Sequence, residues 1–155
     1  MKHNNRAIIL SLLVFTAVSI IVRLLPHVPN FAPIGALALF SGIYAVRKWQ
    51  LIFPIAAMLI SDMIIGFYDV GTMTIVYLGF LVFILVGRFV RNNKNVLTVV
   101  GGTLAGSVFF YLSTNFAVWT FSGMYARTAS GLISSYVMAV PFFRNSFLGD
   151  LFYTG

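Results

Sequence analysis

The stretch RLLPHVPNFAPIGALALFSGIYAV, residues 23–46, decides how the chain is organised. Three prolines within residues 26–33 prevent regular backbone hydrogen bonding and bias each preceding residue toward extended backbone. The apolar run at 34–46 would rise only about 20 Å as a helix, whereas the hydrocarbon core of a bilayer is about 30 Å thick. We therefore expect a shaped loop partly at membrane depth before a short helix, a pattern that points to transporter binding sites.

The composition of the whole chain excludes a soluble protein. Its 155 residues are 60% hydrophobic and 8% charged, with a mean hydropathy of +0.98, whereas soluble domains carry about 25% charged residues. The high hydropathy excludes a disordered chain, and the absence of cysteine excludes a disulfide-stapled scaffold. We expect one integral membrane domain over residues 1–155.

The spacing of apolar runs predicts an all-α, polytopic transmembrane helical bundle. Residue Pro141 is expected to divide the last apolar segment, so that a sixth helix begins only at about Phe143 and is cut short at Gly155. The expected elements are five spans, at about 7–25, 33–47, 50–67, 73–90 and 96–121, and the start of a sixth at 143–155.

The cations cluster at alternate gaps between the apolar runs. The gaps between these clusters hold Asp69 or only Arg127. This alternation predicts a cytoplasmic N-terminus. Because the net charge of +7 then follows from the orientation of the helices in the membrane, no nucleic acid partner is expected. Seven of the ten cations form the three clusters: Lys2, Arg6, Arg47, Lys48, Arg88, Arg91 and Lys94.

Small residues recur in the 96–121 run. Gly102-x-x-x-Gly106 and Gly101-x-x-x-Ala105 allow close approach of a neighbouring helix. We expect these motifs to pack helices within the bundle rather than to form a dimer.

No set of residues in the sequence forms a recognisable catalytic or metal-binding motif. The two histidines, His3 and His27, lie far apart, and glutamate is absent, so neither a nucleophile with its base nor an H-E-x-x-H motif is present. We therefore expect no enzyme activity, no cofactor and no metal. An intramembrane enzyme that uses Asp62 and Asp150 is the alternative within this class.

Asp62 lies inside an apolar span, where a carboxylate costs several kcal/mol unless it is paired or hydrated. Two explanations stay open at this point. Asp62 either contacts a ligand in a cavity or forms an ion pair with Arg23, Arg88 or Arg144 that holds helices together.

A stripe of mostly polar residues follows one face of the 96–121 run: Ser107, Tyr111, Thr114, Asn115 and Val118 recur at three- and four-residue spacing. The stripe leads toward the end of the bundle where the 26–33 loop lies, which favours contact with a solute over bonding between helices. A lone loop histidine such as His27 has the alternative of simple solvation. The predicted solute-binding residues are His27, Asn30, Phe31, Asp62, Tyr111, Thr114, Asn115, Trp119, Tyr125 and Arg127.

Three strings, RLLPHVPNFAPIGALALFSG (23–42), FYLSTNFAVW (110–119) and YARTASGLISSYVMAVPFFRNSFLGDLFYT (125–154), together resemble an uncharacterised family of small bacterial integral membrane proteins. That family is similar in turn to the substrate-binding S components of energy-coupling-factor (ECF) vitamin transporters. The resemblance implies six helices in the bacterial cytoplasmic membrane, both termini cytoplasmic, and a first loop that covers an outward pocket for a water-soluble vitamin or related small organic solute.

The same resemblance implies partners, namely an ECF coupling subunit and two ATPases. Consistent with this, the sequence has no G-x-x-x-x-G-K-[ST] phosphate loop of its own. The first helix departs from the S-component pattern because it has no clean Ala-x-x-x-Ala docking motif. The alternative from another class is a structural or assembly protein of the membrane without a ligand, whose polar residues only join helices to one another.

Overall fold

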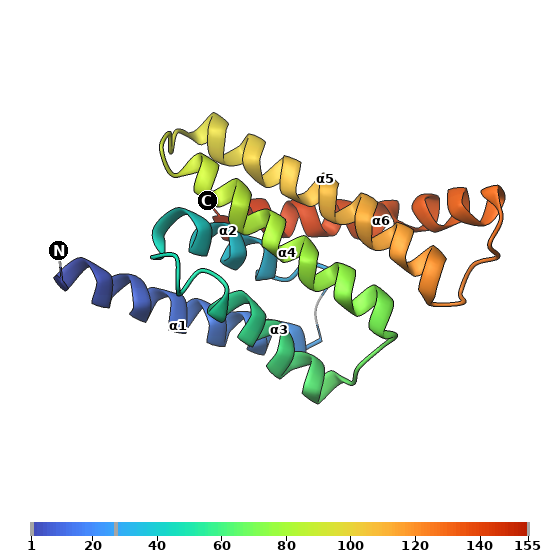
Figure 1. Ribbon diagram of the computed structural model, residues 1–155, viewed down its shortest axis with the longest axis horizontal. Coiled ribbons are helices and arrows are strands. Elements are labelled where there is room, and N and C mark those ends of the chain that lie inside the picture. The colour runs from blue at the N-terminus through green and yellow to red at the C-terminus, as the bar shows by residue number, and fades with distance from the viewer. Residues whose placement is uncertain (1, 27, 155) are drawn as a thin grey trace.

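A computed structural model describes residues 2–26 and 28–154 and shows six helices and no strand in these ranges (Figure 1). The prediction of an all-α fold is confirmed. The helices are α1 (Lys2–Leu24), α2 (Ile34–Tyr44), α3 (Ile52–Ile65), α4 (Val70–Val90), α5 (Val96–Phe121) and α6 (Ala129–Thr154).

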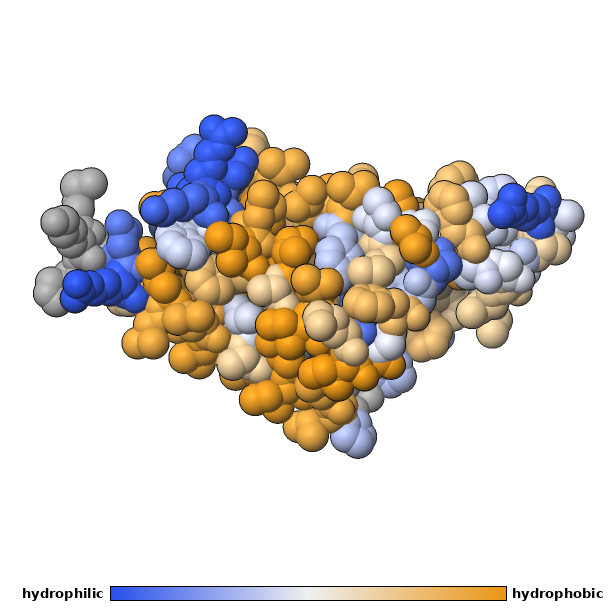
Figure 2. Space-filling view, turned by 60° about the horizontal axis from the view of Figure 1, so that its bottom comes forward, coloured by the Kyte–Doolittle hydropathy of each residue, from blue (hydrophilic) through white to orange (hydrophobic). Residues whose placement is uncertain are grey.

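Three helices within the described residues are long and apolar enough to cross a membrane, namely Asn5–Leu24 within α1, α4 and α5. Helices α2 and α3, with 11 and 14 residues, are apolar but shorter. On the face that Figure 2 shows, hydrophobic residues cover most of the middle, and the most hydrophilic ones gather toward the two ends. This distribution is that of a membrane protein, with three clear candidate spans where the sequence predicted five.

The sixth helix does not begin near Phe143, as predicted, but at Ala129, and it continues through Pro141. The expectation failed because an interior proline costs about 3 kcal/mol in a water-exposed helix, but neighbouring helices support such a site in a bundle. Helix α5 packs against α6 on both sides of the proline, since the Tyr111 ring centroid lies 5.7 Å from that of Tyr136 and 4.9 Å from that of Phe143. The Tyr111 hydroxyl also donates to the Tyr136 backbone carbonyl over 2.7 Å.

Helix α2 lies at the centre of the bundle and contacts each of the other five helices. Nine of its eleven residues are buried. A short helix buried in this way needs partners for the unpaired N–H groups at its start and the unpaired carbonyls at its end.

Glycines bring α2 and α4 into backbone contact. A Cβ atom on Gly42 would meet the backbone of Ile84 and Gly87, and one on Gly87 would meet the backbone of Leu39 and Gly42. Any side chain at Gly42 or Gly87 would therefore force the two helices apart.

Glycines of α5 pack against α4. Gly102 faces Val86 and Val90, and Gly106 faces the Phe83 ring, whereas a Cβ on Gly101 would have nothing within 4 Å. The Gly102-x-x-x-Gly106 motif therefore serves packing within the bundle.

The end of α2 receives side chains from outside the helix. Arg91 donates through Nε to the Ile43 carbonyl over 2.7 Å and also donates to the Ala45 carbonyl. Gln50, which is 1% exposed, donates to the Ala45 carbonyl and accepts a 2.6 Å hydrogen bond from Arg88. Positive charge at this position also suits the negative end of the helix dipole.

The N-terminus, the α2–α3 connection and the α4–α5 connection lie toward the same end of the bundle (Figure 1). Lys94, in the last of these, lies 4.7 Å from the ring centroid of Tyr44 at the end of α2. The three cation clusters found in the sequence therefore gather at one end, and the α1–α2, α3–α4 and α5–α6 connections lie toward the other.

Candidate functional site

A cavity of about 340 Å³ is lined mainly by residues of α2, α4, α5 and α6, together with Arg23 of α1, Met58 of α3 and residues of the α1–α2 and α3–α4 connections. This volume lies in the range of about 300–1,000 Å³ that is typical of small-molecule sites. Its wall is mostly apolar and aromatic. The side chains that bring polar atoms to it are Arg23, Asn30, Tyr68, Thr72, Ser107, Tyr111, Thr114, Asn115, Ser146 and Asp150.

The packing of α4 on α5 gives the cavity its long dimension. Gly79 lies against Phe110, and Gly106 lies against Phe83, so the two helices run antiparallel. Thr72 and Phe83 both line the cavity and are 11 residues apart on α4, which corresponds to about 16 Å along the helix. The cavity thus extends along α4, with Thr72 toward one end and Phe83 toward the other.

Asp150 of α6 lies at the Phe83 end and is 5% exposed. Ser107 Oγ donates to its Oδ2 atom over 2.9 Å, and the backbone of Ala36 also forms a hydrogen bond with the carboxylate. Ala36 belongs to the first turn of α2, whose N-cap residue, Pro33, has no side-chain hydrogen bond to the helix. Asp150 therefore caps α2 from another helix, where negative charge suits the helix dipole.

Gly35 makes room for this contact, because a Cβ atom at this position would collide with the Asp150 carboxylate. No arginine or lysine among the described residues forms an ion pair with Asp150. Among the described residues, the polar contacts of this carboxyl group are those with Ser107 and with the start of α2.

Thr72 lines the cavity near the opposite end. Thr72 is 6% exposed, and its Oγ1 atom has no hydrogen-bond partner among the described residues. The backbone N–H of Thr72, in contrast, donates to Asp69 Oδ1 over 2.7 Å. Asp69 thereby caps the first turn of α4. A buried hydroxyl without a partner costs about 1–3 kcal/mol, so this group is a candidate hydrogen-bonding contact for an occupant of the cavity.

Tyr68, in the α3–α4 connection, also lines the cavity. Burial, reinforced by the nearby Asp62 carboxylate, raises the pKa of Tyr68 to about 12. Its hydroxyl therefore stays protonated at neutral pH and can donate a hydrogen bond.

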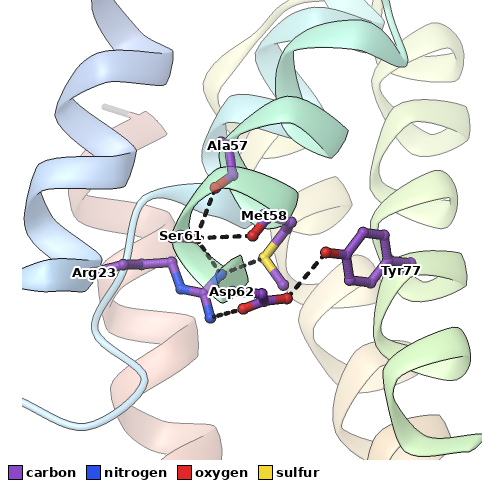
Figure 3. A network of polar contacts seen from close by, with 6 residues as sticks. All are labelled: Arg23, Ala57, Met58, Ser61, Asp62 and Tyr77. Atoms are coloured by element: carbon purple, nitrogen blue, oxygen red, sulfur yellow. Dashed lines mark hydrogen bonds and ion pairs between the residues drawn. The ribbon is translucent and has the colours of Figure 1, made fainter. Parts of the chain in front are cut away.

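Asp62 belongs to a polar network that joins α1, α3 and α4 and borders the cavity through Arg23 and Met58 (Figure 3). Its Oδ1 atom lies 2.8 Å from Arg23 Nη2, and its Oδ2 atom accepts a 3.0 Å hydrogen bond from the Tyr77 hydroxyl. Arg23 also donates to Ser61 Oγ over 2.7 Å and contacts the Met58 sulfur at 2.9 Å. Of the two explanations left open for Asp62, the structure shows the ion pair with Arg23, and Asp62 does not line the cavity.

The polar stripe of α5 does face the cavity, through Tyr111, Thr114 and Asn115. All three side chains also bond to backbone carbonyls. The Tyr111 hydroxyl donates to Tyr136 over 2.7 Å, Thr114 donates to Phe110 over 2.7 Å, and Asn115 Nδ2 donates to Tyr111 over 2.8 Å. Only the Tyr111 bond joins two helices, α5 and α6, because the other two bonds stay within α5.

The predicted residues of the first loop divide between the cavity and the helix packing. Asn30 lines the cavity and has a left-handed backbone, with φ of 62°. Phe31 instead packs against α6, with ring centroids 5.9 Å from Phe152 and 5.8 Å from Tyr153. His27 lies outside the described residues.

The predicted residues around the end of α5 and the α5–α6 connection do not line the cavity. Trp119 Nε1 donates to the Ala126 carbonyl over 3.0 Å, and Arg127 donates to the Thr120 carbonyl over 2.6 Å. Trp119, Tyr125 and Arg127 are absent from the lining. Trp119 lies in the last turn of α5, whereas Tyr125 and Arg127 belong to the segment that connects α5 to α6.

Sequence reasoning did not place Thr72 or Asp150 in the binding site. Thr72 was missed because the fourth span was expected to begin at 73, although Asp69, three residues earlier, has the spacing of an N-cap. Asp150 was considered only as an enzyme residue, yet an acid in an apolar segment is a signal for a cavity. No group of three or more metal-ligating side chains lies together among the described residues.

Comparison with known proteins adds a family but no named relative. No curated protein and no solved structure matches the chain. The chain matches DUF6580, a family of unknown function, over residues 1–155, and it belongs to that family.

Proposed function

We propose that this protein is a membrane protein that binds a small organic solute in the cavity between α2, α4, α5 and α6. The observation that carries the proposal is the cavity itself, whose volume lies in the range of small-molecule sites and whose wall combines aromatic rings with polar side chains. One lining residue, Thr72, also has a buried hydroxyl without a partner among the described residues, and such groups are expected to find one.

The position of the cavity supports a role in uptake. Asn30 and Tyr68 belong to connections toward the end opposite the cation clusters. If those clusters are cytoplasmic, as the positive-inside rule predicts, this end of the cavity faces outward across a bacterial cytoplasmic membrane. In this proposal, the shorter helices α2 and α3 and the proline-containing α6 complete the membrane bundle begun by α1, α4 and α5.

The protein would then act as a solute-capturing subunit that resembles an ECF S component for a vitamin or related compound. A coupling subunit and ATPases on other chains would supply the energy, since this sequence has no phosphate loop.

The test is to fill the cavity and measure its contents. Ala139 lines the cavity and is 8% exposed, whereas Val137, on the same helix, is 60% exposed. We expect native mass spectrometry of the purified wild-type protein to show a co-purified small molecule that Ala139→Phe loses and Val137→Phe retains. A wild-type protein without any bound small molecule, or equal occupancy in both variants, would contradict the proposal.

A second candidate is a structural membrane protein without a ligand. It is favoured by the hydrogen bonds from Tyr111, Thr114 and Asn115 to backbone carbonyls, which satisfy these groups without any solute. It leaves the unpartnered Thr72 hydroxyl unexplained. It predicts that Ala139→Phe changes only the stability of the protein in detergent.

A further inference from the structure

We propose that the solute bound in the cavity is an organic cation, with a protonated amine that lies at Asp150 and a flat aromatic body that lies along the phenylalanine wall. This inference rests on the proposed function, because it names the chemical class of the molecule that the cavity binds. It is carried by the charges, the hydrogen bonds and the rings of the cavity wall.

The charges of the wall leave Asp150 without a counterion. Arg23 and Asp150 are the charged side chains in the described lining. The guanidinium of Arg23 is occupied by Asp62 at 2.8 Å and by Ser61 at 2.7 Å. The cavity therefore offers one uncompensated acid, and a cationic group on the solute matches it.

The Asp150 carboxylate also has room for further donors. An ionised carboxylate offers about four lone-pair sites. Ser107 and the Ala36 backbone use some of them. A protonated amine brings up to three N–H donors, and in surroundings of low dielectric constant the attraction between the two charges is stronger than in water.

Aromatic rings form the wall beside this acid. The Phe110 ring centroid lies 5.0 Å from that of Phe80 and 6.4 Å from that of Phe83, and all three residues line the cavity. Such ring clusters stack with flat aromatic molecules and attract cations to their faces. An aromatic amine therefore satisfies the acid and the rings together.

The distance along α4 adds a second polar contact. Thr72 lies about 16 Å from the level of Phe83, and its free hydroxyl suits a hydrogen-bonding group at the far end of the solute. We expect this contact to contribute to affinity but not to the selection of charge.

Three probes with one ring system test the inference: tryptamine, tryptophol and indole-3-acetate carry a cationic, a neutral and an anionic side chain. Their binding to the protein in lipid nanodiscs is measured by the shift of the calorimetric unfolding temperature, since a ligand that binds the folded state raises this temperature. Empty nanodiscs correct for partition into lipid. We expect tryptamine to bind the wild-type protein at least tenfold more tightly than either of the other probes.

Two variants locate the source of this preference. Asp150→Asn keeps the size of the side chain and an oxygen acceptor but removes the charge, and it should weaken tryptamine binding at least tenfold and tryptophol binding less than threefold. Asp69→Asn is the matched control, because Asp69 does not line the cavity and asparagine can also fill its place as the N-cap of α4, and it should keep the order of the three probes.

The outcomes separate this inference from the proposed function. Equal or tighter binding of tryptophol or indole-3-acetate to the wild-type protein overturns the assignment of a cation, and this comparison needs no variant to fold. If none of the probes binds, the assignment of a cation is also overturned. In that case the proposed binding function stands if the purified protein carries a co-purified solute, and it falls if the protein carries none. Unchanged tryptamine affinity in a folded Asp150→Asn variant places the cation elsewhere and overturns the role of Asp150.

Discussion

Asp62 and Asp150 are two aspartates in apolar helices, 1% and 5% exposed, that have opposite surroundings. Asp62 meets the Arg23 guanidinium at 2.8 Å and the Tyr77 hydroxyl at 3.0 Å. Asp150 meets only the Ser107 hydroxyl and the start of α2, and it lines the cavity. Asp62 therefore has a cationic partner within the protein, whereas Asp150 has none among the described residues.

This difference shows that the burial of an acid does not by itself tell whether the acid stabilises the fold or is available to a ligand. When a buried acid has a cationic partner, breaking the pair lowers the stability of the protein, because the remaining charge is left without compensation. A buried acid that faces a cavity instead remains available to a ligand. The following predictions measure how far the two acids differ.

The largest effect is expected for Arg23→Met, which leaves Asp62 buried without its cation. Breaking one partner of a buried pair costs about 3–5 kcal/mol, so the free energy of unfolding in detergent should fall by about this amount. Arg144→Met is the control, because Arg144 is exposed and forms no ion pair among the described residues. A loss below about 1 kcal/mol for Arg23→Met would show that the pair does not hold the helices.

The double variant Arg23→Met/Asp62→Leu sharpens this result. Apolar residues of similar volume often replace a buried pair without loss of stability, so the double variant should recover most of the stability that the single variant loses. Additive losses measured by the same unfolding experiment would contradict the ion-pair account.

A smaller effect is expected for Ser107→Ala, which removes one of the hydrogen bonds to Asp150. A hydrogen bond to a charged group is worth about 1.5–3 kcal/mol, and the free energy of unfolding should fall within this range. Ser113→Ala on the same helix removes a hydroxyl that bonds only to carbonyls of its own helix, and it should change stability by only about 0.5 kcal/mol. Equal effects of the two variants would argue against a structural role for the Ser107–Asp150 contact.

The smallest change in stability is expected for Thr72→Val. Its hydroxyl has no partner to lose, so the solute-free protein should be unchanged or up to about 1 kcal/mol more stable. Occupancy by the co-purified solute, measured by native mass spectrometry, should nevertheless fall. Thr74→Val is the control, because Thr74 bonds its own helix at Val70 and does not line this cavity; retained occupancy in Thr72→Val would remove Thr72 from the site.

The features that depend on local sequence could be predicted. The spacing of Gly102 and Gly106 places both on one helix face, and that face packs on α4. The polar stripe of Tyr111, Thr114 and Asn115 likewise shares one face, which lines the cavity. In both cases the helical repeat alone brings the residues together.

The features that depend on contacts between distant segments could not be predicted from the sequence. The sequence gives no sign that α2 needs an acid from α6 at its first turn, so Asp150 was not assigned to the binding site. It also gives no sign that α5 supports α6 on both sides of Pro141, so the sixth helix was placed too late. Arg23 was one of three candidate partners for Asp62, and only the packing of α1 on α3 selects it.

The central claim is that the cavity beside Asp150 binds a solute through this acid. Native mass spectrometry of the purified wild-type protein, Asp150→Asn and Asp69→Asn tests it most directly, because Asp69 does not line the cavity. The account predicts one small molecule bound per folded wild-type chain, retained in Asp69→Asn and lost in Asp150→Asn. A wild-type protein without a bound molecule, or loss of the molecule only in Asp69→Asn, would contradict it.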